Sequence, residues 1–289
     1  DAFLRDGNAQ AVRRSLAVLG CMAAVNLGLA LAQYFGSAES PLTVRGSFGN
    51  RNVLGGFLAL ALPLCFAGAC AARGWLVKGL CGLLFVAGLT VNLSGASYFA
   101  VALAVAGMAA MRGPKLFIPV AALLAAWQIL VLRELPREND LVHFRSVALY
   151  DEAGQVERRY PDWQAAYNMA LTHPWLGVGL GNYQKHVGQY YDNVPRQTGP
   201  SEPDIQNLYL VLAASCGWPA LFAFLAMFGA AARSSGAAGC RPLSWGVSGA
   251  LAAFALTAVW HPLLVRGIGL PLVFLFALAR HLSRPEVGD

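Results

Sequence analysis

The sequence predicts an all-α membrane protein, a polytopic bundle of transmembrane helices with one large extracytoplasmic loop that contains short amphipathic helices. Low charge, long apolar blocks and an uneven distribution of Lys and Arg support this prediction. Of the 289 residues, 57% are apolar and only 12% are charged. A soluble domain usually carries about 25% charged residues. So little polarity cannot cover a surface that faces water.

The apolar residues fall in about eight blocks with almost no ionisable group inside them. Most are long enough to cross a hydrocarbon core of ~30 Å as a helix. The blocks are 16–35, 53–72, 76–93, 98–111, 116–132, 205–232, 243–262 and 263–282. Because the fourth block is short, seven or nine spans are open alternatives. Residues 1–289 are expected to form a single membrane domain, in which residues 133–204 form the loop.

The Lys and Arg residues give this bundle an orientation. With a cytoplasmic N-terminus, the short outer turns hold only Arg45, Arg51 and Arg266. The short inner segments then hold Arg5, Arg13, Arg14, Arg73, Lys78, Arg112, Lys115, Arg233, Arg241, Arg280 and Arg284. Because short cytoplasmic loops carry an excess of Lys and Arg, both termini are predicted to be cytoplasmic and the loop 133–204 to lie outside.

Nucleic acid is not an expected partner, although the formal net charge is +6. Half of the basic residues act as topology signals, and no basic run is interleaved with aromatic residues. Five cysteines lie in or beside apolar blocks, and Cys240 lies in an inner segment. Because the loop 133–204 contains no Cys, neither a disulfide framework nor a zinc site is expected there. No metal and no cofactor are predicted.

The loop contains a helical pattern over residues 161–172, where apolar residues follow the spacing i, i+3, i+4, i+7, i+8. These residues are Trp163, Ala166, Tyr167, Ala170 and Leu171. Pro161 and Asp162 suit the start of a helix, and His173 with Pro174 suits its end. Three glycines follow. A second short helix is then predicted around Tyr183, Val187, Tyr190 and Tyr191.

Amphipathic segments with Trp and Tyr lie flat at a membrane interface. We therefore expect the loop helices to lie at the membrane surface. The alternative, that they merely cap the helix bundle, remains open.

The apolar blocks contain no Asp or Glu, which disfavours a proton-coupled transporter, since such proteins generally need carboxylates inside the membrane. Their interior polar residues are Asn26, Gln33, Asn92 and Gln128, with His261 near a membrane end. The outer face instead offers cations, namely Arg45, Arg51, Arg158, Arg159, Lys185, Arg196 and Arg266. Arg binds phosphate bidentately, so an anionic ligand at the outer leaflet is expected. Each Arg taken singly also fits a solvated or headgroup-facing side chain.

The stretch from Arg158 to Asn182, RRYPDWQAAYNMALTHPWLGVGLGN, resembles the signature of the O-antigen ligase and O-antigen polymerase superfamily. In that signature Arg and Trp precede a short helix that ends in a Pro-x-x-Gly-x-Gly-x-Gly-Asn turn. Two further pieces agree in order and position. They are GSFGNRNVLGG from Gly46, and Asn207-Leu-Tyr-Leu followed by Gly217. Together the pieces extend over residues 43–228.

The resemblance implies a multi-pass glycosyltransferase of the bacterial inner membrane with a periplasmic loop, acting in lipopolysaccharide or polysaccharide biosynthesis. Its donor would be a glycan linked to a polyprenyl diphosphate such as undecaprenyl diphosphate. Its acceptor would be the lipid A core, another lipid-linked glycan or a protein hydroxyl, and membrane lipids would surround it.

A diphosphate leaving group requires cationic side chains that take up its developing charge. The expected diphosphate ligands are Arg45, Arg51, Arg158 and Arg159. Within the matching motifs, Trp163, Asn182 and Asn207 are expected to support the site.

Two positions depart from the family pattern. The family usually has His, taken as the base, immediately before the residue that matches Asn207, whereas this chain has Gln206. An amide cannot accept the proton. The family often has Ser-Arg-Gly where this chain reads Ser94-Gly95-Ala96. His186 is the expected substitute base, and the other nearby candidates are His173, Asp204 and Glu202.

Three hypotheses follow from the sequence. The chain is a lipid-linked glycan transferase, or a member of the same fold that has lost or changed its activity, or a membrane transporter or other membrane protein of unrelated function. The loop signature and the outer arginines favour the first, whereas Gln206 and Gly95 favour the second.

Overall fold

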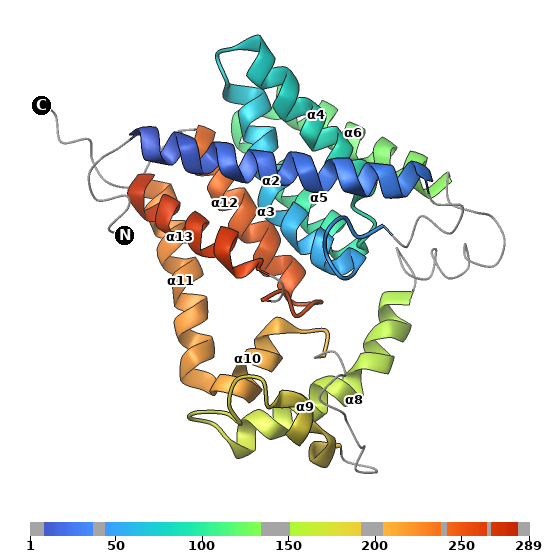
Figure 1. Ribbon diagram of the computed structural model, residues 1–289, viewed down its shortest axis with the longest axis vertical. Helices are drawn as coiled ribbons and strands as arrows, with labels where there is room; N and C mark the ends of the chain where they lie inside the picture. The colour runs from blue at the N-terminus through green and yellow to red at the C-terminus, as the bar shows by residue number, and fades with distance from the viewer. Residues whose placement is uncertain are drawn as a thin grey trace, which may run out of the picture. The chain divides into compact units, whose positions relative to one another are not determined.

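The computed structural model describes residues 9–36, 44–133, 151–191, 205–237, 242–264 and 267–282, and every regular element among them is a helix (Figure 1). The all-α prediction is confirmed for this part of the chain. The helices are α2 Ala9–Gly36, α3 Arg51–Ala71, α4 Trp75–Val91, α5 Gly95–Arg112, α6 Pro114–Arg133, α8 Asp151–Thr172, α9 Tyr183–His186, the 3₁₀ helix η3 Val187–Tyr190, α10 Leu208–Cys216, α11 Trp218–Ala237, α12 Pro242–Ala258 and α13 Gly269–Leu282.

The chain divides into two compact units. The first takes its residues from Asp1–Pro136, Gly229–Thr257 and Val265–Asp289, and the second from Arg137–Phe228 and Ala258–Leu264. The boundary therefore falls within α11 and at the end of α12.

Three described helices are long and apolar enough to cross a membrane, namely Arg14–Gly36, Arg51–Ala71 and Gly95–Arg112. Shorter apolar helices occupy Trp75–Val91, Pro114–Trp127, Pro242–Ala258 and Gly269–Leu282. These apolar helices indicate a membrane protein. The full set of eight spans, the single membrane domain and the side on which the loop lies stay predictions.

Helix α3 is the central helix of the first unit. Asn50 caps its start, because its side-chain oxygen accepts a hydrogen bond from Val53 N at 2.9 Å. Such a cap satisfies one of the backbone N–H groups left free at a helix start. From Leu54 to Leu62 the large side chains are almost completely buried. Apolar residues all around a helix indicate full burial.

Small residues allow the neighbours of α3 to pack closely. A side chain at Gly55 would meet Ser94, just before α5, and Ser97 within it at 2.9 Å, and one at Gly68 would meet the sulfur of Cys81 on α4 at 2.7 Å. Ser97 Oγ donates a 2.6 Å hydrogen bond to the Gly55 carbonyl. Close approach at small residues is a common mode of helix packing in membranes.

Two sequence predictions of helix boundaries are corrected by the structure. The apolar block 205–232, predicted as one span, contains α10 and α11, because Gly217 between them has φ +84° and a left-handed residue ends an α-helix. The loop helix predicted from Pro161 begins at Asp151 instead, so that Pro161 lies inside α8. Its predicted end at Thr172 is correct.

Candidate functional site

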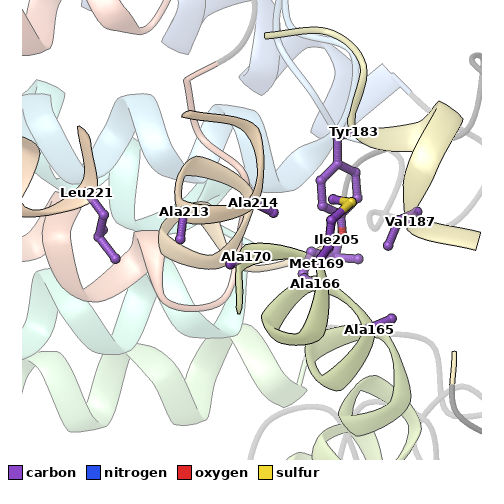
Figure 2. Close-up of a cluster of buried hydrophobic side chains, with 10 residues drawn as sticks. All are labelled: Ala165, Ala166, Met169, Ala170, Tyr183, Val187, Ile205, Ala213, Ala214 and Leu221. Carbon is purple, nitrogen blue, oxygen red and sulfur yellow. The ribbon is translucent and has the colours of Figure 1, made fainter. Parts of the chain in front are cut away.

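The second unit is built around one apolar cluster between α8, the α9–η3 segment and α10 (Figure 2). Ala165, Ala166, Met169 and Ala170 form the stripe of α8 that enters this cluster. The cluster also contains Tyr183, Val187, Ile205, Ala213, Ala214 and Leu221. Alanines at this spacing allow α10 to approach α8 closely. The one short helix predicted around Tyr183, Val187, Tyr190 and Tyr191 is present as two consecutive short helices, α9 and η3.

The turn after α8 binds the end of α10 through its backbone. Val178 N–H donates to the Ala214 carbonyl at 3.0 Å, and Gly179 N–H donates to the Ser215 carbonyl at 2.9 Å. The last carbonyls of a helix have no partner within the helix. The turn supplies partners for two of these carbonyls, so the end of α10 is held against it.

Glycines make this backbone contact sterically feasible. A Cβ atom at Gly177 would lie 2.5 Å from Cys216 N and from Ser215 O, and one at Gly217 would lie 2.8 Å from Pro174 O. Trp218 N–H, at the start of α11, donates to the same Pro174 carbonyl at 2.8 Å. The Pro-x-x-Gly-x-Gly pattern therefore joins α8 to the α10–α11 break. We call this arrangement the backbone clamp.

Asn182 closes the turn. Its Nδ2 donates to the Val178 carbonyl at 3.3 Å, and its Oδ1 accepts from Lys185 Nζ at 3.0 Å. The amide therefore holds both the turn and an exposed cation at the start of α9.

Side-chain hydrogen bonds attach the end of η3, and the residue that follows η3, to α8. Tyr191 OH donates to Asp162 Oδ1 at 2.7 Å, and Asn168 Nδ2 donates to the Tyr190 carbonyl at 3.4 Å. His173 Nε2 lies 3.0 Å from Tyr190 OH. Of the predicted alternative bases, His173 therefore has a tyrosine partner, whereas Asp204 and Glu202 lie outside the described residues.

Arg159 and Trp163, one helical turn apart on α8, both contact Trp260. The Arg159 Cζ atom lies 6.0 Å from the centre of the Trp260 ring, which is within reach of a cation–π interaction. The Trp163 and Trp260 ring centres are 5.8 Å apart. Sequence reasoning missed Trp260, since no local pattern links residue 260 to residue 159. Arg158 also belongs to α8, but its side chain lies outside the described part.

Gln206 and Asn207 precede α10 and differ in role. Asn207 is buried and caps α10, because its Oδ1 accepts from Leu210 N at 3.1 Å. Gln206 is exposed. It lies two residues before the first residue of α10, and the helix dipole favours negative charge near a helix N-terminus. His186, the predicted substitute base, is half-buried at the end of α9.

In the first unit, Arg45 and Arg51 flank a turn that Gln33 of α2 holds in place. Gln33 Oε1 accepts from both Arg45 N and Gly46 N at 2.9 Å, and Gln33 Nε2 donates to the Gly46 carbonyl at 2.9 Å. Arg45 is exposed, whereas Arg51 is half-buried as the first residue of α3.

A second amide on the same face of α2 holds the next residue of the turn. Asn26 Oδ1 accepts from Ser47 Oγ at 2.6 Å and from Ser47 N at 3.3 Å. The sequence showed Asn26 and Gln33 only as polar residues in an apolar block. Their spacing of seven residues places both on one helical face, but their partners are visible only in the structure.

The other departure from the family pattern, Ser94-Gly95-Ala96, lies at the start of α5. Ser94 is buried and precedes the helix, and Gly95 is its first residue. Buried Asn92 donates through Nδ2 to Ser97 Oγ at 3.1 Å. In this chain neutral hydrogen bonds therefore occupy the region where relatives often carry a cation.

A family model described as O-antigen ligase matches residues 50–225, which is more than half of the chain. The chain belongs to the O-antigen ligase family. The matched region includes Arg51, Arg159, the backbone clamp and Gln206. A comparison with curated proteins gave no match.

Membership in the O-antigen ligase family implies lipid-linked glycan and acceptor partners in general terms. Within the second unit, the structure brings Arg159 and Trp163 onto Trp260, and it shows Asn182 and Asn207 as residues that order the turn and α10. Arg45 and Arg51 belong to the other unit. Among the described residues, no group of three or more His, Cys, Asp or Glu side chains is arranged to hold a metal ion.

Proposed function

We propose that this O-antigen ligase family member is a glycosyltransferase that transfers or polymerises a glycan from a polyprenyl-diphosphate donor onto an acceptor hydroxyl. The reaction takes place at the outer face of the bacterial inner membrane. The family match over residues 50–225 is the observation that carries the proposal. The acceptor is the lipid A core, a growing lipid-linked glycan or a protein hydroxyl.

In this proposal Arg45, Arg51, Arg158 and Arg159 bind the donor diphosphate. Breaking the bond between the sugar and the diphosphate leaves negative charge on the phosphate oxygens, and guanidinium groups stabilise that charge through paired N–H donors. Two local features support the assignment. Gln33 orders the backbone of Arg45, and Arg51 opens α3, where the helix dipole adds partial positive charge.

The acceptor hydroxyl must lose a proton as it attacks. Gln206 cannot take that proton, but its exposed amide can orient a hydroxyl or a phosphate oxygen, because it carries both donors and an acceptor. We assign the role of base to His186, which lies half-buried on α9. His173 is less suited because it already interacts with Tyr190 OH.

A second function has specific support. Gln206 and Gly95 replace the His and Arg that the family usually carries, so the chain also fits a donor-binding member of the fold that has lost its base. The two readings differ in whether the chain transfers glycan as it stands.

Transfer should be measured with purified protein in proteoliposomes, with a polyprenyl-diphosphate-linked oligosaccharide and each acceptor class in turn, using mass spectrometry of the product. Arg159→Gln should lower the rate by roughly 10² to 10³ fold, as loss of one donor to a developing oxyanion does. Arg73→Gln is the matched control, because Arg73 is an exposed cation outside the proposed site. Equal rates for the two variants would contradict the role of Arg159.

His186→Ala should lower transfer by roughly 10² to 10⁴ fold, the usual contribution of a general base. Gln189→Ala, an exposed change on η3, should leave transfer unchanged. Gln206→His should preserve or raise activity. Transfer that first appears when His is restored at position 206 would instead support the reading in which the chain has lost its base.

A further inference from the structure

Large apolar side chains are exposed on the turn after α8. Trp175, Leu176 and Leu180 have 76%, 83% and 81% of their surface exposed, and Tyr167 and Leu171 on the last turns of α8 are also exposed. We call these five residues the outer apolar patch. Contiguous exposed apolar surface of this kind marks a site of contact with another molecule or with a membrane.

The outer apolar patch adjoins the start of α11. The Tyr167 and Trp218 ring centres are 6.2 Å apart with the rings nearly perpendicular, and Trp218 lies 6.3 Å from Phe222, again between ring centres. Phe222 is itself 62% exposed. The apolar surface therefore runs from α8 onto α11, whose sequence belongs to an apolar block predicted to cross the membrane.

Helix α8 carries two apolar stripes where its sequence pattern predicted one. Ala166 and Ala170 are fully buried in the cluster of the second unit, whereas Tyr167 and Leu171, spaced i and i+4, are exposed beside them. Only the second stripe belongs to the outer apolar patch. Packing within the unit therefore leaves this second stripe exposed, with the Tyr167 ring against Trp218.

The backbone clamp keeps the patch exposed. The hydrogen bonds of Val178 N–H, Gly179 N–H and Trp218 N–H hold both ends of the segment that carries Trp175 and Leu176. A clamped turn cannot simply fold these side chains inward. Trp and Tyr combine an apolar ring with a polar N–H or O–H, which suits the boundary between lipid headgroups and acyl chains.

We propose that the outer apolar patch inserts into the headgroup and acyl-chain boundary of the bilayer that the apolar helices cross. The lipid surface is thus the partner that covers the outer apolar patch. The proposal depends on the protein being in a membrane and not on glycan transfer. Insertion would hold the turn, and with it Asn182 and Lys185, at the depth where a lipid-linked diphosphate lies.

The proposal is tested with an environment-sensitive fluorophore attached at Leu176→Cys in a cysteine-free background. The protein is placed in nanodiscs of phosphatidylethanolamine and phosphatidylglycerol, and activity is not needed. Nitroxide carried near the lipid headgroup should quench this label several-fold more strongly than a label at Gln189→Cys, which is exposed on η3. Aqueous iodide should quench the label at position 189 more strongly than the label at position 176.

A label at position 176 that iodide quenches as well as it quenches position 189 would overturn the proposal. Protection of position 176 from both quenchers would also overturn it, because the patch would then be covered by protein.

A second measurement avoids removing the cysteines. Quenching of intrinsic Trp fluorescence by lipids brominated at a shallow position should be weaker in Trp175→Phe than in the unchanged chain. Equal shallow quenching of the two proteins would place Trp175 outside the bilayer and would count against the proposal.

Discussion

Replacing Gly177 by Ala tests the backbone clamp directly. The new Cβ atom would lie 2.5 Å from Cys216 N and from Ser215 O, so the turn and the end of α10 must separate by about 1 Å to reach ordinary van der Waals contact. Such a shift weakens the hydrogen bonds of Val178 and Gly179. Each backbone hydrogen bond contributes about 0.5–1.5 kcal/mol, and the left-handed φ of +60° costs Ala about 1–2 kcal/mol.

Together these effects predict a loss of about 2–5 kcal/mol in the free energy of unfolding. Gly181→Ala is the matched control, because Gly181 also has a left-handed φ, +76°, but no described atom lies within 4 Å of a Cβ built there. Gly181→Ala should lose only the free energy of about 1–2 kcal/mol that a left-handed φ costs Ala. Both variants should be heated in detergent and their folded fraction followed by size-exclusion chromatography. Equal midpoints would refute the clamp as the reason for glycine at position 177.

Three further predictions concern the turn held by Gln33, the cap of α10 and the membrane topology. Gln33→Ala should speed hydrogen exchange at the amide of Gly46, because the Oε1 acceptor at 2.9 Å is lost; unchanged exchange would show that the turn is held otherwise. Asn207→Ala should destabilise the protein by about 1 kcal/mol through loss of the α10 cap, as measured by thermal unfolding, whereas an Ala at the preceding exposed residue should be nearly neutral. In a cysteine-free background, an impermeant thiol reagent added to intact cells should label Gln189→Cys and spare Arg233→Cys, and the reverse pattern would invert the predicted topology.

Much of the helical content of this protein is readable from the sequence, because it depends on local patterns. Long apolar blocks without carboxylates predict helices with apolar surfaces, and the structure has helices in these blocks. The signature from Arg158 to Asn182 likewise carries the family, and the family match includes it. The joint role of Arg45, Arg51, Arg158 and Arg159 stays a prediction.

The break at Gly217 shows where local patterns fail. The sequence of an apolar block does not show whether a glycine within it is tolerated inside one helix or ends that helix. Here the left-handed φ and the contact with Pro174 decide the outcome, and that partner lies more than forty residues earlier. Pro161 shows the converse, since a residue typical of a helix start lies inside α8.

The sequence by itself determined that the chain forms apolar helices, that three glycines follow the predicted loop helix, and that the chain lacks the His usual in the family. Only the tertiary structure decided which stripe of α8 is buried, that Trp260 meets Arg159 and Trp163, and that Asn26 and Gln33 hold the turn between Arg45 and Arg51. The reason is physical. Helix formation and hydrophobic periodicity depend on residues within a few positions of each other, whereas the partner of a side chain depends on which distant segment the packed fold brings within a few ångströms.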